Sequence, residues 1–148
     1  MMVKTILCVC DSSYQEVVES VTHNLRNMGL SFETVYQTNL PDAKEALNHQ
    51  AFNGVFLYDL QIPTGEKYYP HPKYLDYGSD RLSFEACSPG LELLDYCHEM
   101  KKPIVACSPT SVPGIRERAE KLGNLDTLLA FPLNLNELRA QFKEKFGL

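Results

Sequence analysis

The chain has 148 residues, of which 44% are hydrophobic and 22% charged, and its formal net charge is −5. This length fits one domain with a full hydrophobic core and is too short for two ordinary domains. The acidic balance disfavours nucleic acid and anionic membrane surfaces as partners. Asp11 interrupts the first apolar stretch too early for a signal peptide, and no later stretch approaches a membrane-spanning length. We therefore expect a cytoplasmic protein.

Short apolar runs alternate with amphipathic stretches of helical period, in five pairs. This alternation predicts an α/β domain with a parallel sheet between helices. The predicted strands are residues 6–9, 32–36, 55–58, 103–107 and 127–131. The predicted helices cover residues 14–28 and 112–122, with others opening at Pro41-Asp42, at Ser88-Pro89 and at a capping box of Asn134 and Glu137.

Apolar stripes at steps of three and four predict the buried faces of these helices. In the first helix the stripe consists of Val17, Val21, Leu25 and Met28, with Ser12 or Ser13 as the N-terminal cap and Gly29 as the stop. In the third, Leu91, Leu94 and His98 share one face. We interpret His98 as a half-buried structural histidine rather than a metal ligand.

The cysteines do not form a recognisable metal or redox motif. They occupy positions 8, 10, 87, 97 and 107, and no pair has the two-residue spacing of zinc or thioredoxin-like sites. We interpret them as buried free thiols, with Cys8 and Cys10 on one strand face.

Two acidic residues follow predicted strands. Asp59 comes directly after the apolar run 55–58, and Asp11 follows the first strand one residue after Cys10. The carboxyl ends of parallel strands form the ligand-binding edge of open α/β sheets. The pattern predicts that both carboxylates face one crevice, although Asp11 before Ser12-Ser13 also fits an ordinary helix N-cap.

The connection after Asp59 is unusually long. An insertion at about residues 64–88 separates the third strand from the third helix and carries Tyr68, Tyr69, Tyr74 and Tyr77. Such connections normally have a few residues, so a segment of this length and aromatic content favours a protein-contact surface close to the crevice or over the neighbouring surface.

Five segments, in this order, resemble the receiver domains of two-component response regulators. They are residues 4–11, 58–63, 90–94, 103–108 and 132–138, and together they span nearly the whole chain apart from the insertion. The resemblance implies a CheY-like, flavodoxin-like fold with one doubly wound five-stranded sheet in the order 2-1-3-4-5. It also implies a stand-alone signalling domain whose output is a protein-binding surface rather than an enzymatic reaction.

The resemblance also implies roles for individual residues. Asp59 is the expected phosphoacceptor, and Ser108 matches the hydroxyl that hydrogen-bonds the phosphoryl group and acts in the switch. Asp11, Asp59 and the backbone carbonyl of Gln61 are the expected ligands of Mg²⁺, a cation that prefers oxygen donors. The implied partners are a histidine kinase or phosphotransfer protein, a downstream protein, and a second copy of the chain as a homodimer.

The chain departs from the receiver pattern at three positions. Cys10 stands where the family has its other acidic residue, which weakens the expected Mg²⁺ site. Phe131 replaces the lysine that pairs with the phosphate, and Leu128 replaces an aromatic switch residue. Lys67 and Lys73 in the insertion are candidates to supply the missing charge. A pseudo-receiver that is never phosphorylated is therefore the alternative to a phosphorylated receiver.

Two other functions fit parts of the sequence. Cys10 before a helix N-terminus resembles the phosphocysteine loop of sugar phosphotransferase IIB proteins, where the helix dipole lowers the thiol pKa. That loop normally needs glycine, and none occurs between Cys10 and Gly29. A flavodoxin-type FMN site fits less well, because Asp11 places negative charge where phosphate would bind.

Overall fold

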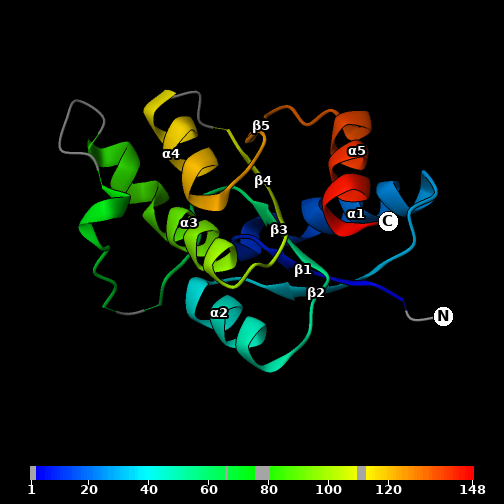
Figure 1. Cartoon of the computed structure of the whole chain (residues 1–148), viewed down its shortest axis with the longest axis horizontal. Coiled ribbons are helices and arrows are strands. Elements are labelled where there is room, and N and C mark those ends of the chain that lie inside the picture. The colour runs from blue at the N-terminus through cyan, green and yellow to red at the C-terminus, as the bar shows by residue number, and fades with distance from the viewer. Residues whose placement is uncertain (1–2, 66, 76–80, 110–112) are drawn as a thin grey trace.

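The computed structural model describes residues 3–65, 67–75, 81–109 and 113–148 and confirms the predicted fold class. Five parallel strands are hydrogen-bonded in the order β2-β1-β3-β4-β5 (Figure 1). The strands are β1 (Thr5–Val9), β2 (Glu33–Gln37), β3 (Gly54–Tyr58), β4 (Ile104–Ser108) and β5 (Leu129–Ala130). The helices are α1 (Gln15–Asn27), α2 (Leu40–His49), α3 (Arg81–Glu99), α4 (Pro113–Gly123) and α5 (Leu135–Phe146). Two 3-10 turns, η1 (Ser12–Tyr14) and η2 (Pro72–Tyr74), lie between them.

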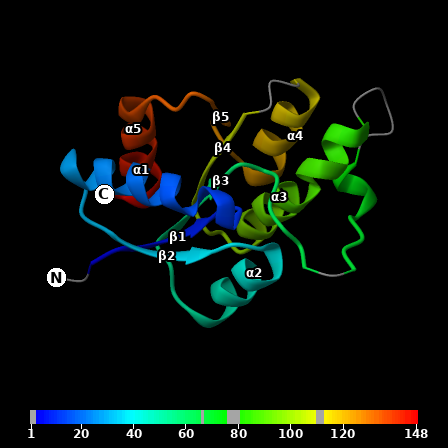
Figure 2. The same cartoon turned by 180° about the vertical axis from the view of Figure 1, so that it is seen from behind.

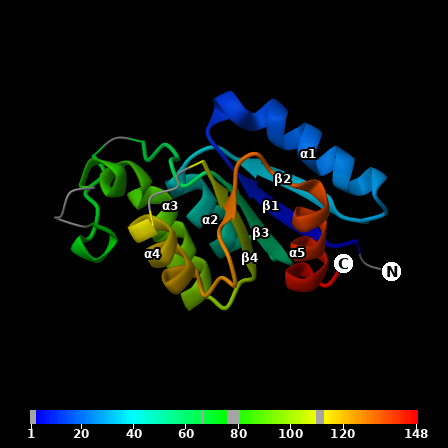
Figure 3. The same cartoon turned by 90° about the horizontal axis from the view of Figure 1, so that it is seen from above.

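Helices cover both faces of the sheet, with α1 and α5 on one side and α2, α3 and α4 on the other (Figure 3). Successive side chains of a strand point to opposite faces, so each strand contributes to both cores. In β1, Leu7 and Val9 pack with the α2–α4 layer, whereas Ile6 and Cys8 pack with the α1 and α5 layer. Cys10 joins Cys8 in the second core, and all five cysteines are free and buried, as predicted.

The first helix is rotated relative to the predicted stripe. Its buried residues are Val18, Thr22 and Leu25, while Val17 is 45% exposed. The cap prediction was also wrong, because Asp11 rather than Ser12 or Ser13 caps the chain, at the start of η1. The 3-10 turn η1 precedes α1, which begins only at Gln15, and helical spacing in the sequence does not predict this turn.

The third helix begins earlier than predicted, at Arg81, and Pro89 lies inside it. Proline lacks the amide that would donate to the carbonyl of Glu85. The Ser88 hydroxyl donates to that carbonyl instead, at 2.7 Å. The next amide, Gly90 N–H, leaves the helix and donates to Leu60 O at 2.9 Å. A proline that looked like a helix start is therefore tolerated because a side chain and a neighbouring loop replace the lost hydrogen bonds.

The remaining predictions about the helices have mixed outcomes. Asn134 accepts a hydrogen bond from Glu137 N–H at 3.1 Å and caps α5 as expected. His98 is exposed rather than half-buried. Val112, where the fourth helix was predicted to begin, lies outside the described residues, as does Tyr77 of the insertion. Among the described helices, none is both long and apolar enough to span a membrane.

Candidate functional site

The strand register places the predicted site residues at one edge of the sheet. Tyr58 of β3 pairs with Cys107 of β4. Asp59, which directly follows β3, and Ser108, the last residue of β4, are therefore neighbours at the ends of two paired strands. Asp59 N–H donates to Cys107 O at 2.8 Å, which continues the ladder past β3. Leu57 pairs with Val9 on the other side, so β1 ends at the same edge, shortly before Asp11.

Asp59 is a buried acid in a left-handed backbone conformation. Its exposed fraction is 5% and its φ is 76°, a region that non-glycine residues seldom occupy outside functional or strongly constrained positions. Gln61 N–H donates to Asp59 Oδ1 at 3.2 Å. Burial raises the pKa of Asp59, and hydrogen bonds from the Gln61 and Leu60 amides and from Ser108 only partly oppose this. The site therefore binds the carboxyl group firmly but disfavours its negative charge.

Asp11 serves as a cap in this structure. Its Oδ1 accepts hydrogen bonds from Ser13 N–H at 3.0 Å and from the Ser13 hydroxyl at 3.1 Å. The carboxylate still lies near enough to Asp59 for its charge to contribute to raising the pKa of Asp59. Asp11 and Asp59 thus follow neighbouring strands at the same edge of the sheet, and Asp11 also has the capping role that the sequence left open.

Cys10 does not have the properties of a phosphocysteine. The thiol is fully buried, and its pKa is raised to about 11 by burial and by the charges of Asp11 and Glu19. A lowered pKa was expected from the helix N-terminus, and this expectation was wrong. The Ser13 amide of the turn donates to the Asp11 carboxylate, and α1 begins only at Gln15. A thiolate nucleophile is therefore disfavoured at neutral pH.

An aromatic cluster occupies the position where a receiver has its lysine. The rings of Tyr58 and Phe131 lie 4.9 Å apart, and those of Tyr14 and Tyr58 lie 5.6 Å apart. Tyr14 is 41% exposed, so the cluster reaches the surface beside the crevice. Sequence analysis identified the loss of the lysine at Phe131 but not the two tyrosines, because no spacing rule links residues 14 and 58.

The two candidate lysines from the insertion have different surroundings in the structure. Lys73 Nζ is paired with Asp95 on α3 at 2.6 Å. Lys67 lines a hollow with Lys44 of α2 and Glu92 of α3, and Asp59 does not border that hollow. The suggestion for Lys73 was therefore wrong, because Asp95 holds it on α3, and the suggestion for Lys67 stays a prediction.

The described residues of the insertion are anchored to α3 and α4 by polar contacts, of which the one to Asp95 is buried. Tyr74 is 6% exposed, and its hydroxyl donates to Asp95 Oδ2 at 2.8 Å. Tyr68 donates to Glu92 Oε1 at 3.2 Å, and Arg118 of α4 donates to Lys73 O at 2.7 Å. The segment lies on the outer side of α3, at the end of the molecule far from α1 and α5 (Figures 1 and 2). The neighbouring-surface position expected from the sequence is the one observed.

The crevice offers few ligands for a divalent cation. Within the described ranges, no group of three or more histidine, cysteine, aspartate or glutamate side chains could hold a metal ion. Asp11 and Asp59 are the two acids that follow neighbouring strands at this edge of the sheet, and Asp11 Oδ1 already accepts two hydrogen bonds from Ser13. Cys10 packs into the α1 and α5 core. The donor set therefore does not fit a resident Mg²⁺, which requires charged oxygen ligands in near-octahedral geometry.

Solved structures share this fold over nearly their whole length. A response regulator receiver domain from Francisella matches with a TM-score of 0.66 and 16% identity over 97% of each chain. The receiver domain of a Pseudomonas aeruginosa sensor histidine kinase matches with a TM-score of 0.64 and 18% identity, over 99% of this chain and 100% of that one. The chain has the fold of a response regulator receiver domain.

Two of these structures show what other receiver domains bind. The Pseudomonas domain has a magnesium ion coordinated in its active-site cleft. A Saccharomyces cerevisiae receiver domain, similar to this chain with a TM-score of 0.63 and 15% identity over 98% of this chain and 90% of that one, was solved with a histidine phosphotransfer protein. No protein-family model matches the sequence, and no curated protein matches it. The likeness is therefore one of fold rather than of closely similar sequence.

The raised pKa of Asp59 predicts a pH-dependent effect of its substitution. The folded state holds the Asp59 proton to a higher pH than the unfolded state, whose carboxyl titrates near 3.8. The contribution of Asp59 to stability is thus full below that pH and falls as the pH rises through the folded pKa. Asp59→Asn, which cannot ionise and tolerates a positive φ, is expected to raise the free energy of unfolding at pH 7.

Urea unfolding of both proteins between pH 3 and pH 8 measures this effect. The difference should disappear at the acidic end of the series. Glu45→Gln removes an exposed carboxylate from α2 and should change stability little at any pH. An Asp59→Asn protein that is less stable than the parent at pH 7 would contradict the burial argument.

Proposed function

We propose that this chain is a receiver-type signalling module of a two-component or phosphorelay pathway. Its output is a protein-binding surface, and Asp59 is its phosphoacceptor. The partners are a phosphorylated histidine on a kinase or phosphotransfer protein and a downstream protein. The structure of a receiver domain with a histidine phosphotransfer protein supports this class of partner.

The observation that carries the proposal is the pairing of Asp59 with Ser108. The carboxyl group stands at the end of the central strand, and the Ser108 hydroxyl of the neighbouring strand hydrogen-bonds to it. The amides of Leu60 and Gln61 also point at the carboxyl group. A nucleophilic oxygen is therefore surrounded by donors that suit the oxygens of a transferred phosphoryl group.

The proposed step moves one phosphoryl group. An ionised Asp59 oxygen attacks phosphorus, the new P–O bond forms as the P–N bond to the donor imidazole breaks, and the electron pair returns to that imidazole nitrogen. The backbone amides and Ser108 hold the acceptor in line. Because burial favours protonated Asp59, the fraction of reactive carboxylate should increase as the pH rises through its raised pKa.

One set of observations favours a second candidate, a pseudo-receiver that holds one state without phosphorylation. Phe131 packs on Tyr58 where the phosphate-pairing lysine would stand, and the buried Cys10 thiol replaces an acid. These changes remove a positive charge that would stabilise the transferred phosphoryl group and weaken any cation site. In this version Asp59 stabilises the loop that it begins, and the protein-binding surface is constitutive.

A small phosphodonor separates the two candidates. We expect acetyl phosphate, with millimolar Mg²⁺ supplied in the buffer, to add the mass of one phosphoryl group, and the adduct should be lost in Asp59→Asn. The rate should be well below that of a receiver with its lysine and both acids, since one lost charged contact costs about tenfold or more. Intact-protein mass spectrometry with peptide mapping measures both results.

Phe131→Lys provides the matched gain-of-function variant. It restores an ammonium group at the position that the receiver pattern reserves for one and should increase the adduct rate. The Tyr69→Lys variant adds the same charge at a side chain that is 86% exposed and should not. If neither the parent nor Phe131→Lys forms an adduct, the pseudo-receiver is the correct reading. An adduct on Cys10 would instead support the phosphocysteine function.

A further inference from the structure

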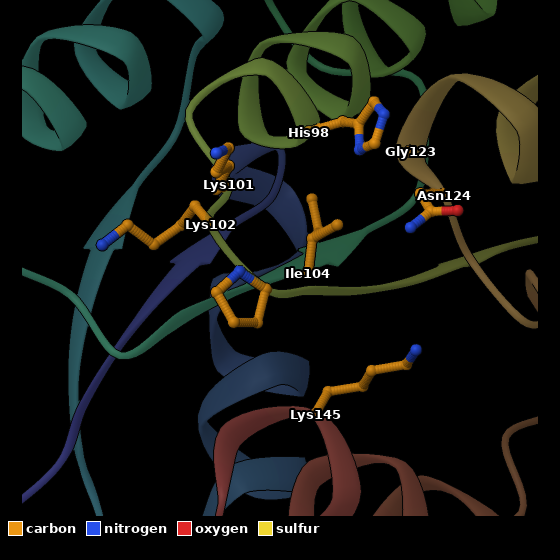
Figure 4. Close-up of a pocket in the computed structure, with 8 residues that line it drawn as sticks. His98, Lys101, Lys102, Ile104, Gly123, Asn124 and Lys145 are labelled. Atoms are coloured by element: carbon orange, nitrogen blue, oxygen red, sulfur yellow. The ribbon is translucent and has the colours of Figure 1, made fainter.

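A hollow at the opposite edge of the sheet from Asp59 is lined by basic side chains. It lies where β4 begins, beside the ends of α3 and α4, and has a volume of about 300 Å³ (Figure 4). His98, Lys101, Lys102 and Lys145 contribute to its lining, and no described aspartate or glutamate does. This concentration of positive charge contrasts with the net charge of −5 for the whole chain.

Hydrogen bonding at the helix ends does not use up these side chains. Lysine side chains near a helix C-terminus often donate hydrogen bonds to the last carbonyl groups of the helix. Here backbone amides do so, because Lys102 N–H donates to Cys97 O at 2.8 Å and Leu125 N–H donates to Glu120 O at 2.8 Å. The side chains of His98 and Lys101 form no ion pair within the described part of the chain. The Lys101 ammonium group and the ring nitrogens of His98 are therefore available to a ligand.

Nitrogen-bearing side chains surround the apolar side chain of Ile104 in this hollow. Figure 4 shows the imidazole of His98, the amide of Asn124 and the ammonium group of Lys145 around the side chain of Ile104. Lys102 points away from them, and its Nζ donates to Phe52 O at 2.6 Å. Three nitrogen-bearing groups around a hollow suit the several oxygens of one anion.

One of these groups already binds an oxyanion of the chain itself. Lys145 Nζ pairs with Asp126 Oδ2 at 3.0 Å, and the Asp126 side chain is 61% exposed. An exposed carboxylate of this kind is weakly held and can be displaced by a ligand of higher charge. Asp126 thus acts as an internal competitor at the rim of the hollow.

We propose that this hollow is a binding site for a small phosphate-bearing molecule. A phosphate carries more negative charge and more acceptor oxygens than a carboxylate, and the volume is at the lower end of that of small-molecule sites. Lys145, His98 and Asn124 hold the phosphate oxygens, Lys101 adds long-range attraction, and Ile104 with Pro103 contacts any attached organic group. The site is independent of Asp59, so it goes beyond the proposed function.

An NMR titration with inorganic phosphate at pH 7 tests the proposal. At constant ionic strength, phosphate should cause saturable shifts of the amides around residues 98–104 and 123–124, and acetate should not. Lys145→Met should weaken binding about tenfold, whereas Lys143→Met, an exposed lysine on the same helix, should not. Asp126→Asn should tighten binding about threefold, because the competing carboxylate is gone.

The other outcomes overturn the inference. Shifts that do not saturate, equal shifts with acetate, or unchanged binding in Lys145→Met would each exclude a phosphate site in this hollow. Asp59→Asn should bind phosphate as the parent protein does. Failure of the titration and failure of phosphorylation at Asp59 are therefore separate results.

Discussion

Gly90→Ala is expected to lower the free energy of unfolding by about 3 kcal/mol, because the added methyl group has no space. A Cβ at this position would lie 2.4 Å from both Leu60 Cα and Leu60 O, and these are backbone atoms that cannot rotate away. The substitution would also disturb the hydrogen bond from Gly90 N–H to Leu60 O. Because Leu60 directly follows Asp59, the same change should displace the amides that hold the Asp59 carboxyl group.

Gly114→Ala is the matched control for this prediction. A Cβ on Gly114 of α4 would lie 3.5 Å from the Phe84 ring, an ordinary van der Waals contact. Alanine also restricts the unfolded chain more than glycine, so this variant should gain up to about 1 kcal/mol. Urea unfolding monitored by circular dichroism measures both. Equal stabilities for the two variants would show that the contact between α3 and the Asp59 loop is loose.

Phe142→Ala is expected to cost about 3–5 kcal/mol, a large part of the stability of a domain of this size. The Phe142 ring is fully buried and lies 5.2 Å from Phe56 of β3, 5.6 Å from Phe32 and 4.8 Å from Phe146. Its removal would leave a cavity between α5 and the central strand, and these neighbouring rings cannot fill it without changing rotamers.

Two variants accompany Phe142→Ala. Phe142→Leu keeps much of the volume and should cost about 1.5 kcal/mol, so it reports on packing even if the alanine variant does not fold. Tyr69→Ala removes a ring that is 86% exposed and should change stability by less than about 0.5 kcal/mol. A thermal or urea midpoint for Phe142→Ala close to that of Tyr69→Ala would contradict the assigned core.

Predictions from the sequence were most successful where hydrophobic periodicity or capping residues are compatible with only one local structure. The alternation of apolar runs and helical stripes predicted the parallel α/β fold, and the acids after two strands lie at one edge of the sheet. The N-cap at Asn134, which accepts from Glu137 N–H, also formed as expected. The element types and the cap depend on hydrogen bonds and burial within a few residues, so periodicity and residue type contain the information needed to predict them.

Tertiary contacts decided the structure at positions where the local sequence was compatible with more than one arrangement. Pro89 read as a helix start, yet Ser88 and the Leu60 carbonyl allow α3 to continue through it. Lys73 was a candidate partner for the crevice, yet Asp95 holds it on α3. The deciding groups Leu60 and Asp95 are distant in the sequence from the residues they bind. Ser88 is adjacent to Pro89, but its hydroxyl has several possible hydrogen-bond partners.

The sequence by itself determined the order of strands and helices along the chain, the acids that follow β1 and β3, and the absence of a lysine at Phe131. Only the tertiary structure decided that Asp59 is buried with Ser108, that Asp11 also caps η1, and that the insertion lies along α3. The physical reason is that hydrophobic periodicity specifies which face of an element is buried, whereas hydrogen-bond partners depend on which polar groups the packed elements bring within reach.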